Sequence, residues 1–191
     1  NTALIWAANR GHTEIAQAIL KNEACDKVML NHTDSDGENV LMIAAEQGNI
    51  DMIRAVLNHN ACDAEMLKQQ NIRRGRNVLM FAAIQGYTDI VQAILKSDKC
   101  DAELLKQKGK DGANILVYAA REGHTNIINE LLNRDECDAE MLQEMLQFQD
   151  TKGRNALMLA VQKGHTDVAQ AILNYKAYNA EMLKQKDQTG A

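Results

Sequence analysis

The sequence contains no proline, and only 4% of its 191 residues are aromatic. A core with so few aromatic rings must be built from Ala, Leu, Ile, Val and Met, which are typical of thin layers of packed helices. No apolar run approaches the roughly 18 residues of a membrane-spanning helix. The formal net charge of −5 argues against a nucleic acid or an anionic membrane as the main partner, because both favour a strongly basic surface.

The residue patterns of common catalytic and metal sites are also missing. The only serines, Ser35 and Ser97, do not lie in the Gly-x-Ser-x-Gly pattern of hydrolases. The segment 109–112 contains Gly-Lys but lacks the glycine spacing and the Ser or Thr of a phosphate-binding loop. A calcium loop beginning at His32 is excluded, because His32 replaces an acidic ligand and Ile43 replaces the bidentate Glu. We therefore predict that the chain is not an enzyme and holds no metal or cofactor.

One phrase, in which a cap residue is followed by apolar residues, Ala-Ala or Ala-Val, and a glycine, occurs five times. The closing glycines of the five copies are Gly11, Gly48, Gly86, Gly123 and Gly164. The period is therefore 37, 38, 37 and 41 residues. A repeat of this length is one supersecondary unit that buries its apolar face by stacking on its neighbours. The sequence thus predicts an elongated solenoid, a shape that favours binding of macromolecules over catalysis.

Each repeat is predicted to contain a turn, two helices and a further short helix. The first helix begins after a capping residue and ends at the glycine; the caps are Thr2, Asn39, Asn77, Asn114 and Asn155. The second helix covers about residues 50–58 in the second copy, and in four copies we expect a threonine to cap it: Thr13, Thr88, Thr125 and Thr166. Each Cys-Asp-Ala-Glu-like segment is predicted to form a short helix that is capped by its Asp or Asn and buries the following Met-Leu or Leu-Leu pair. In the fourth copy, duplication of Glu-Met-Leu-Gln within 140–147 adds one helical turn, which explains the 41-residue period.

The four cysteines follow the same period. They are Cys25, Cys62, Cys100 and Cys137, and Tyr178 takes their place in the fifth copy. Equivalent positions in stacked helical repeats lie about 8–10 Å apart, whereas the Cα atoms of a disulfide lie within about 7 Å. Metal sites need closely spaced ligands such as Cys-x-x-Cys, which are absent. We predict reduced, buried thiols and a cytoplasmic protein.

These residues resemble ankyrin repeats. Residues 150–157 are similar to the family's Asp-x-x-Gly-x-Thr opening, 86–95 to its Gly-His and Asp-Ile-Val segment, and 61–63 to its Gly-Ala-Asp ending. The copies depart from the family in lacking its proline, in replacing the histidine of its Pro-Leu-His motif, and in being 4 to 8 residues longer than the usual 33. In the family, the Gly-His histidines, here His12, His124 and His165, bond neighbouring backbone.

The resemblance implies an all-α solenoid of stacked helix-turn-helix units with protruding turns, called fingers. We expect repeats at 1–33, 34–71, 72–108, 109–149 and 150–186, with a sixth starting at Asp187, so that the chain is a fragment of a longer protein. Both cut ends predict a monomer at risk of end-to-end association. The long, Met-rich units are similar in style to ankyrin arrays of intracellular bacteria, which implies a bacterial effector in the host cytosol as an alternative location and role.

The family's concave face implies where a protein partner would bind. The residues expected there are Arg10, Glu46, Gln47, Arg73, Arg74, Arg76, Ile84, Gln85, Lys110, Arg121, Glu122, Lys152, Arg154, Gln162 and Lys163. The finger at 34–39 carries a charge of −3, the one at 72–77 carries +3, the one at 109–114 is neutral, and the one at 150–155 carries +1. The three arginines of 72–77 suit an acidic segment, since guanidinium groups pair bidentately with carboxylates. Alternatively, they form a solvated loop beside the acidic finger.

Other interpretations remain open at this point. One position of the first helix is occupied by Trp6, Ile43, Phe81, Tyr118 and Leu159. This stripe is either core, which we favour, or an aromatic groove. Ile84 is expected to be an exposed apolar contact. The main functional prediction is a protein-interaction scaffold; the alternatives are the targeting arm of an enzyme whose catalytic domain lies outside this chain, and binding of anionic ligands or nucleic acid by 73–76.

Overall fold

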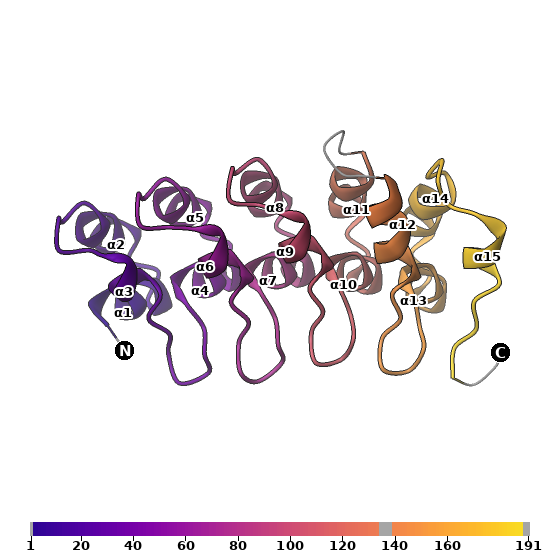
Figure 1. The fold of residues 1–191 in the computed structure, drawn as a ribbon, viewed down its shortest axis with the longest axis horizontal. Helices are drawn as coiled ribbons and strands as arrows, with labels where there is room; N and C mark the ends of the chain where they lie inside the picture. Colours follow the sequence, from indigo (N-terminus) through magenta and orange to yellow (C-terminus); the bar gives the residue numbers. More distant parts are fainter. Residues whose placement is uncertain (1, 134–138, 189–191) are drawn as a thin grey trace.

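A computed structural model describes residues 2–133 and 139–188, and all regular secondary structure in these ranges is helical. Three rows of helices run along the long axis, with the two ends of the chain at opposite ends of the molecule (Figure 1). The predicted all-α solenoid of stacked helical repeats is therefore confirmed.

The rows are made of equivalent helices from successive repeats. The first row contains α1 (Ala3–Asn9), α4 (Val40–Gln47), α7 (Val78–Gln85), α10 (Ile115–Glu122) and α13 (Ala156–Lys163). The second row contains α2 (Thr13–Leu20), α5 (Ile50–Leu57), α8 (Thr88–Leu95), α11 (Thr125–Leu132) and α14 (Thr166–Leu173). The row of short helices contains α3 (Lys27–Leu30), α6 (Ala64–Lys68), α9 (Ala102–Lys106), α12 (Ala139–Gln147) and α15 (Ala180–Leu183).

Buried asparagines begin four of the first-row helices, as predicted. Asn114 accepts a hydrogen bond from the Val117 amide at 3.0 Å, which caps α10. Its side-chain amide donates to the Met145 carbonyl on the short helix α12, at 2.8 Å. Asn39 makes the same two bonds, to the Met42 amide and the Met66 carbonyl. Each of these asparagines therefore joins the start of a repeat to its end, a role that capping alone does not reveal.

The predicted threonine caps of the second-row helices are wrong. Each threonine is the first residue of its helix, and the preceding residue is the cap. His12, Tyr87, His124 and His165 occupy that cap position without a side-chain cap bond. Only in the second repeat does a side chain cap this helix, where Asn49 accepts from the Met52 amide at 3.0 Å. In the third to fifth repeats, the ring at this cap position packs on the preceding repeat.

The rings contact the glycines that end the first-row helices. Gly86 has a φ of +81°, and a Cβ atom there would lie 2.5 Å from Cε1 of His124. Nε2 of His124 donates to the Ile84 carbonyl at 3.1 Å, and Nε2 of His165 donates to the Arg121 carbonyl at 3.2 Å. The expected backbone bonds of these two histidines are confirmed, and they run to the preceding repeat. His12 is exposed and makes no such bond within residues 2–133 and 139–188.

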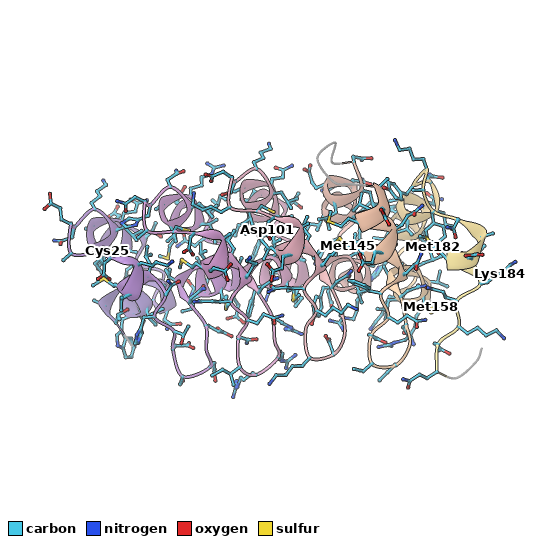
Figure 2. All side chains as sticks on the ribbon, viewed as in Figure 1. Cys25, Asp101, Met145, Met158, Met182 and Lys184 are labelled. Carbon is cyan, nitrogen blue, oxygen red and sulfur yellow. The ribbon has the colours of Figure 1, made fainter. Side chains whose placement is uncertain are left out.

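The short helices make a third set of contacts between repeats. Asp63 caps α6 by accepting from the Met66 amide at 3.0 Å, and Asp101 caps α9 in the same way at 2.8 Å. Nζ of Lys68 lies 3.2 Å from Oδ2 of Asp101 and 2.6 Å from Oε2 of Glu103, both in the next repeat. Figure 2 labels Asp101, Met145 and Met182 along this row. The row therefore adds hydrogen-bonded ion pairs to the helix packing.

The longer fourth repeat has the predicted origin. The helix α12 contains 9 residues, whereas α6 and α9 each contain 5. Both Met-Leu pairs of the duplicated segment, Met141-Leu142 and Met145-Leu146, are buried. The extra turn therefore lengthens the short helix without exposing apolar side chains. In the fifth repeat, Met182 of α15 is buried but Leu183 is 61% exposed, so the predicted burial of the Met-Leu pair fails at Leu183.

The stripe of equivalent first-row residues that begins at Trp6 belongs to the core in four repeats, as we favoured from the sequence. Ile43, Phe81, Tyr118 and Leu159 are each at most 5% exposed. Trp6 differs, because it is 53% exposed and lies 5.9 Å from the guanidinium carbon of Arg10. The stripe is therefore not an aromatic groove.

The predicted burial of the thiols is confirmed at two positions. Cys25 and Cys62 are buried and free, whereas Cys100 is only partly buried, which corrects the expectation for that residue. Burial raises the pKa of Cys62 to about 11. Burial also raises the pKa of Cys25, and Asp26 adds to the effect. Cys137 lies outside the described residues.

Candidate protein-interaction surface

The fingers are four turns that project to one side of the molecule (Figure 1). We number them by repeat: finger 2 (34–38), finger 3 (71–76), finger 4 (109–113) and finger 5 (150–154). Each finger is tied to the next by one backbone bond. These bonds run from the Ile72 amide to the Asp36 carbonyl at 2.9 Å, from Lys110 to Arg74 at 2.8 Å, and from Thr151 to Asp111 at 2.8 Å. The ladder holds the finger tips at regular spacing along the solenoid.

Finger 3 is one residue longer than its neighbours. Oδ1 of Asn71 accepts from the Arg76 amide at 2.9 Å, just as Oδ1 of Asp34 accepts from Glu38 and Oδ1 of Asp150 accepts from Arg154. Asn71 is thus the equivalent of these aspartates. Ile72 donates to the preceding finger from the same position as Lys110 and Thr151, and the added residue is Arg73, which precedes the carbonyl of Arg74 that accepts from the next finger. Sequence reasoning missed this, because the asparagine replaces the family's aspartate. The added residue accounts for the 38-residue period, and the neighbouring Ile72 is 66% exposed.

The C-terminal ends of the first-row helices lie against the fingers. In the fifth repeat, Nη1 of Arg154 donates to Oε1 of Gln162 at 2.9 Å. In the fourth, Nη1 of Arg121 lies 3.4 Å from Oδ2 of Asp111. We call the fingers together with these helix ends the finger face. Side chains of the fingers and of the helix ends therefore meet in the fourth and fifth repeats.

The predicted binding residues differ in how far they reach solvent. The exposed ones are Arg10, Glu46, Gln47, Arg73, Arg74, Gln85, Lys110, Glu122, Lys152, Gln162 and Lys163. The partly buried ones are Arg76, Ile84, Arg121 and Arg154. Ile84 was expected to be exposed, and this expectation is wrong: it packs against the core, and its carbonyl accepts the bond from His124. Ile72, by contrast, is an apolar side chain that is exposed on this face.

The three arginines of finger 3 have different surroundings. Nε of Arg73 pairs with Oδ1 of Asp36 at 3.1 Å, although its side chain remains 72% exposed. The guanidinium carbon of Arg76 lies 5.1 Å from the centre of the Tyr118 ring, and its Nε is buried. Arg74 is exposed and forms no ion pair within residues 2–133 and 139–188. Of these three arginines, only Arg74 is both exposed and without an ion pair in the described structure.

Tyr118 organises the junction between fingers 3 and 4. It is fully buried, and its hydroxyl donates to Oδ1 of Asp111 at 2.6 Å. Burial, and then the bond to Asp111, raise the pKa of Tyr118 to about 12. The guanidinium carbon of Arg121 lies 4.8 Å from the ring centre, close to the distance of Arg76. Cation–π attraction helps to position both guanidinium groups over the ring, and the guanidinium of Arg121 is also paired with Asp111 and Glu122. In the sequence, this junction is indicated only by the presence of Tyr118 in a predicted helix, which is weak evidence.

The second repeat carries the opposite charge. On the finger face its carboxylates are Asp34, Asp36, Glu38 and Glu46, and the segment 34–47 contains no cation. Burial raises the pKa of Glu38, and the nearby carboxylate of Glu46 adds to this, although a hydrogen bond from Asn71 opposes it. The finger face therefore changes sign between the second and third repeats.

Other surfaces lack the features of a chemical site. Within the described residues, no group of three His, Cys, Asp or Glu side chains could hold a metal ion. A polar cleft of about 930 Å³ lies between α5 and α8, on the side away from the fingers. Its lining includes cations and acids, among them Arg54, Lys99 and Asp98, and Lys99 pairs with Asp98 at 2.9 Å. No helix in the described ranges is both long enough and apolar enough to cross a membrane.

Comparison with known proteins agrees with the geometry. The family model described as ankyrin repeats (3 copies) matches residues 1–68, 62–141 and 79–186. No curated protein matches the chain. Ankyrin repeats generally mediate protein–protein interaction and are typically non-catalytic. A family match over nearly the whole sequence, on a solenoid of stacked helical repeats with projecting fingers, makes this chain a member of the ankyrin-repeat family.

Proposed function

We propose that this chain is a protein-binding scaffold whose partner contacts the finger face. One observation carries the proposal: the buried cap asparagine recurs in four repeats, while the exposed residues of the fingers differ between repeats. The exposed residue that follows the first residue of each finger, for example, is Ser35, Ile72, Lys110 and Thr151 in turn. Exposed residues that vary on a rigid scaffold are typical of a surface adapted to one partner.

A partner with an acidic segment suits the third to fifth repeats. Arg74, Lys110, Lys152 and Lys163 are exposed there. Arg76, which lies over the ring of Tyr118, adds a further positive charge. Carboxylates pair well with such cations, and charge complementarity raises the rate of association as well as the specificity. The sequence-based preference for an acidic partner therefore extends from finger 3 to a wider basic surface.

The test is capture of partners from a cytosolic lysate by three forms of the chain. The test variant carries Arg74→Glu, Lys152→Glu and Lys163→Glu, all at exposed residues. A matched control makes the same charge change on the second row and its turns, at Lys21, Arg54 and Lys96, which are also exposed. We expect wild type and control to capture one acidic protein that the test variant loses. Equal capture by all three would place the binding surface elsewhere.

We also propose association between copies through their ends. Apolar side chains are exposed on the first repeat, at Trp6, Ile15 and Val28, and on the last, at Val161, Leu173 and Leu183. Exposed apolar surfaces of stacked repeats favour further stacking. Light scattering should show mass that rises with concentration, and a strictly monomeric species at high concentration would contradict this. Free, buried thiols at Cys25 and Cys62 support the proposed cytoplasmic location.

A further inference from the structure

We infer that the finger face is bipolar and fits an extended protein segment that places basic residues over the second repeat and acidic residues over the third to fifth. This inference rests on the proposed function, and it names the charge pattern of the partner. The sign change of the finger face lies at a single junction, between fingers 2 and 3.

The second repeat lacks enough cations for its carboxylates. Of Asp34, Asp36, Glu38 and Glu46, only Asp36 has an ion pair within residues 2–133 and 139–188, with Arg73 of the next finger. Glu46 is exposed at the end of α4, and its charge disfavours ionisation of the half-buried Glu38. A lysine or arginine placed here by a partner would relieve the repulsion among these carboxylates.

The basic half has the converse arrangement. Within the described residues, the exposed side chains of Arg74, Lys152 and Lys163 form no ion pairs. Lys110 is exposed and donates to the backbone carbonyl of Ile72, which leaves its charge without a carboxylate. These four cations span three repeats. They are therefore positioned to meet several carboxylates in succession.

The scaffold sets the spacing of the partner's charges. Packed helices of neighbouring repeats lie about 8–10 Å apart, and an extended chain advances about 3.3 Å per residue. One repeat thus corresponds to roughly three residues of an extended segment. The backbone bonds between fingers, such as the Ile72 amide to the Asp36 carbonyl at 2.9 Å, keep this spacing. We expect the basic residues to be followed by acidic ones about three, six and nine positions away.

A uniform polyanion fits this surface less well. A nucleic acid lying along the solenoid would place phosphates over the carboxylates of the second repeat as well as over the cations. Repulsion at Glu46 and its neighbours would offset attraction at Arg74. The inference therefore favours a protein segment with both signs of charge and treats an oligonucleotide as a competing outcome.

The experiment measures the binding of four fluorescent probes to the wild-type chain of 191 residues. The first is a synthetic peptide with three lysines at one end, a short Gly-Ser spacer, and three glutamates spaced three residues apart. The second has the same composition with alternating charges, the third replaces the lysines with glutamates, and the fourth is a single-stranded oligonucleotide of similar length. Fluorescence anisotropy at low salt should rank the first peptide above the other probes by roughly fivefold or more in affinity.

Two single variants test each half of the surface. Glu46→Lys should remove the preference of the chain for the first peptide over the acidic one. Arg74→Glu should weaken the affinity for both peptides by roughly threefold or more. Glu23→Lys and Arg54→Glu make the same charge changes at exposed residues away from the finger face and should alter neither. Matched unfolding curves would exclude folding defects as the cause.

The outcomes separate this inference from the proposed function. If the acidic or alternating peptide binds as well as the first, the bipolar pattern is wrong, although a protein-binding role still stands. If no peptide binds, the bipolar inference is again wrong, and the lysate experiment decides the proposed function alone. Tighter binding of the oligonucleotide would overturn both.

Discussion

The cap asparagines and the finger tips lie a few residues apart in each repeat, yet they differ in almost every property. Asn39, Asn77, Asn114 and Asn155 are at most 2% exposed, and all cap their helices through the same hydrogen bond. The tips are exposed, and they change charge from finger 2 to finger 3. The comparison separates residues that hold the solenoid together from residues that are free to recognise a partner.

The physical basis of this difference is burial. A buried polar side chain must satisfy the backbone groups around it, and asparagine can both accept and donate at one position. An exposed tip is solvated whatever its charge, so stability places few limits on it. Arg74 and Asn77, three positions apart in the same repeat, should therefore respond to substitution in opposite ways.

The largest effect is expected from Asn114→Ala. The change leaves the Val117 amide and the Met145 carbonyl without their buried partner, at a cost of about 3 kcal/mol in the free energy of unfolding. Urea denaturation would measure it. Asn58→Ala, at an exposed asparagine, serves as the control. A loss below about 1 kcal/mol would mean that water replaces the side chain.

A smaller effect is expected at the glycines that end the first-row helices. Gly86→Ala should cost about 2 kcal/mol, because alanine is strained at φ +81° and its Cβ would lie 2.5 Å from His124. Gly164→Ala provides a matched control: φ is +73°, but no atom lies within 4 Å of the added Cβ, so only about 1 kcal/mol is expected. Equal losses in thermal or urea unfolding would show that the ring moves aside without cost.

A pH-dependent effect is expected at finger 5. Burial tends to raise the pKa of Asp150, but hydrogen bonds from the side chain and amide of Arg154 outweigh it, and the pKa is lowered. A lowered pKa stabilises the fold above the ordinary value near 3.9 and loses this contribution as the pH falls through the folded-state pKa. Arg154→Met should therefore cost less than about 1 kcal/mol at pH 7, and the difference from wild type should shrink toward pH 3.

Unfolding in urea at both pH values checks this prediction. Lys152→Met, at the exposed tip of the same finger, is the control and should show no such trend. A difference for Arg154→Met that stays constant with pH would assign its cost to lost packing rather than to the ion pair with Asp150, whose Nη2–Oδ2 distance is 2.6 Å.

The smallest effect on stability is expected from Arg74→Glu. Its side chain is exposed and unpaired among the described residues, so the free energy of unfolding should change by less than about 0.5 kcal/mol. Binding of an acidic segment should nevertheless weaken. Calorimetry of the unbound protein would settle the first point. A loss of stability comparable with that of Asn114→Ala would remove the distinction between tips and caps.

Sequence reasoning predicted most of the fold because its evidence is local and repeated. The asparagine caps, the helix-ending glycines and the lengthened α12 each follow from a few adjacent residues. It failed where neighbouring repeats decide the outcome. The prediction that Thr88 caps α8 is wrong because Tyr87 holds the cap position and its ring packs over Gly48 of the preceding repeat. The residues next to Thr88 in the sequence do not indicate this packing. The prediction that Ile84 is exposed is wrong because its side chain packs against the core formed by the stacked repeats.

The candidate site was predictable only in outline. The family resemblance indicated the finger face, and the sequence shows which charges it carries. Two features needed the structure: the added residue in finger 3, recognised from the bonds of Asn71, and the junction at Tyr118. Both depend on contacts between residues that are not adjacent in the chain.

By itself, the sequence determined the repeat, its helices and their caps, because hydrogen bonding and apolar spacing over a few residues dictate each of these. The tertiary structure alone decided which charges are free to act. Arg74 and Arg76 are two positions apart and chemically identical, yet one is solvated and the other lies over Tyr118 of the next repeat. Stacking of the repeats brings that ring to Arg76 and not to Arg74, and no pattern within a single repeat contains this information.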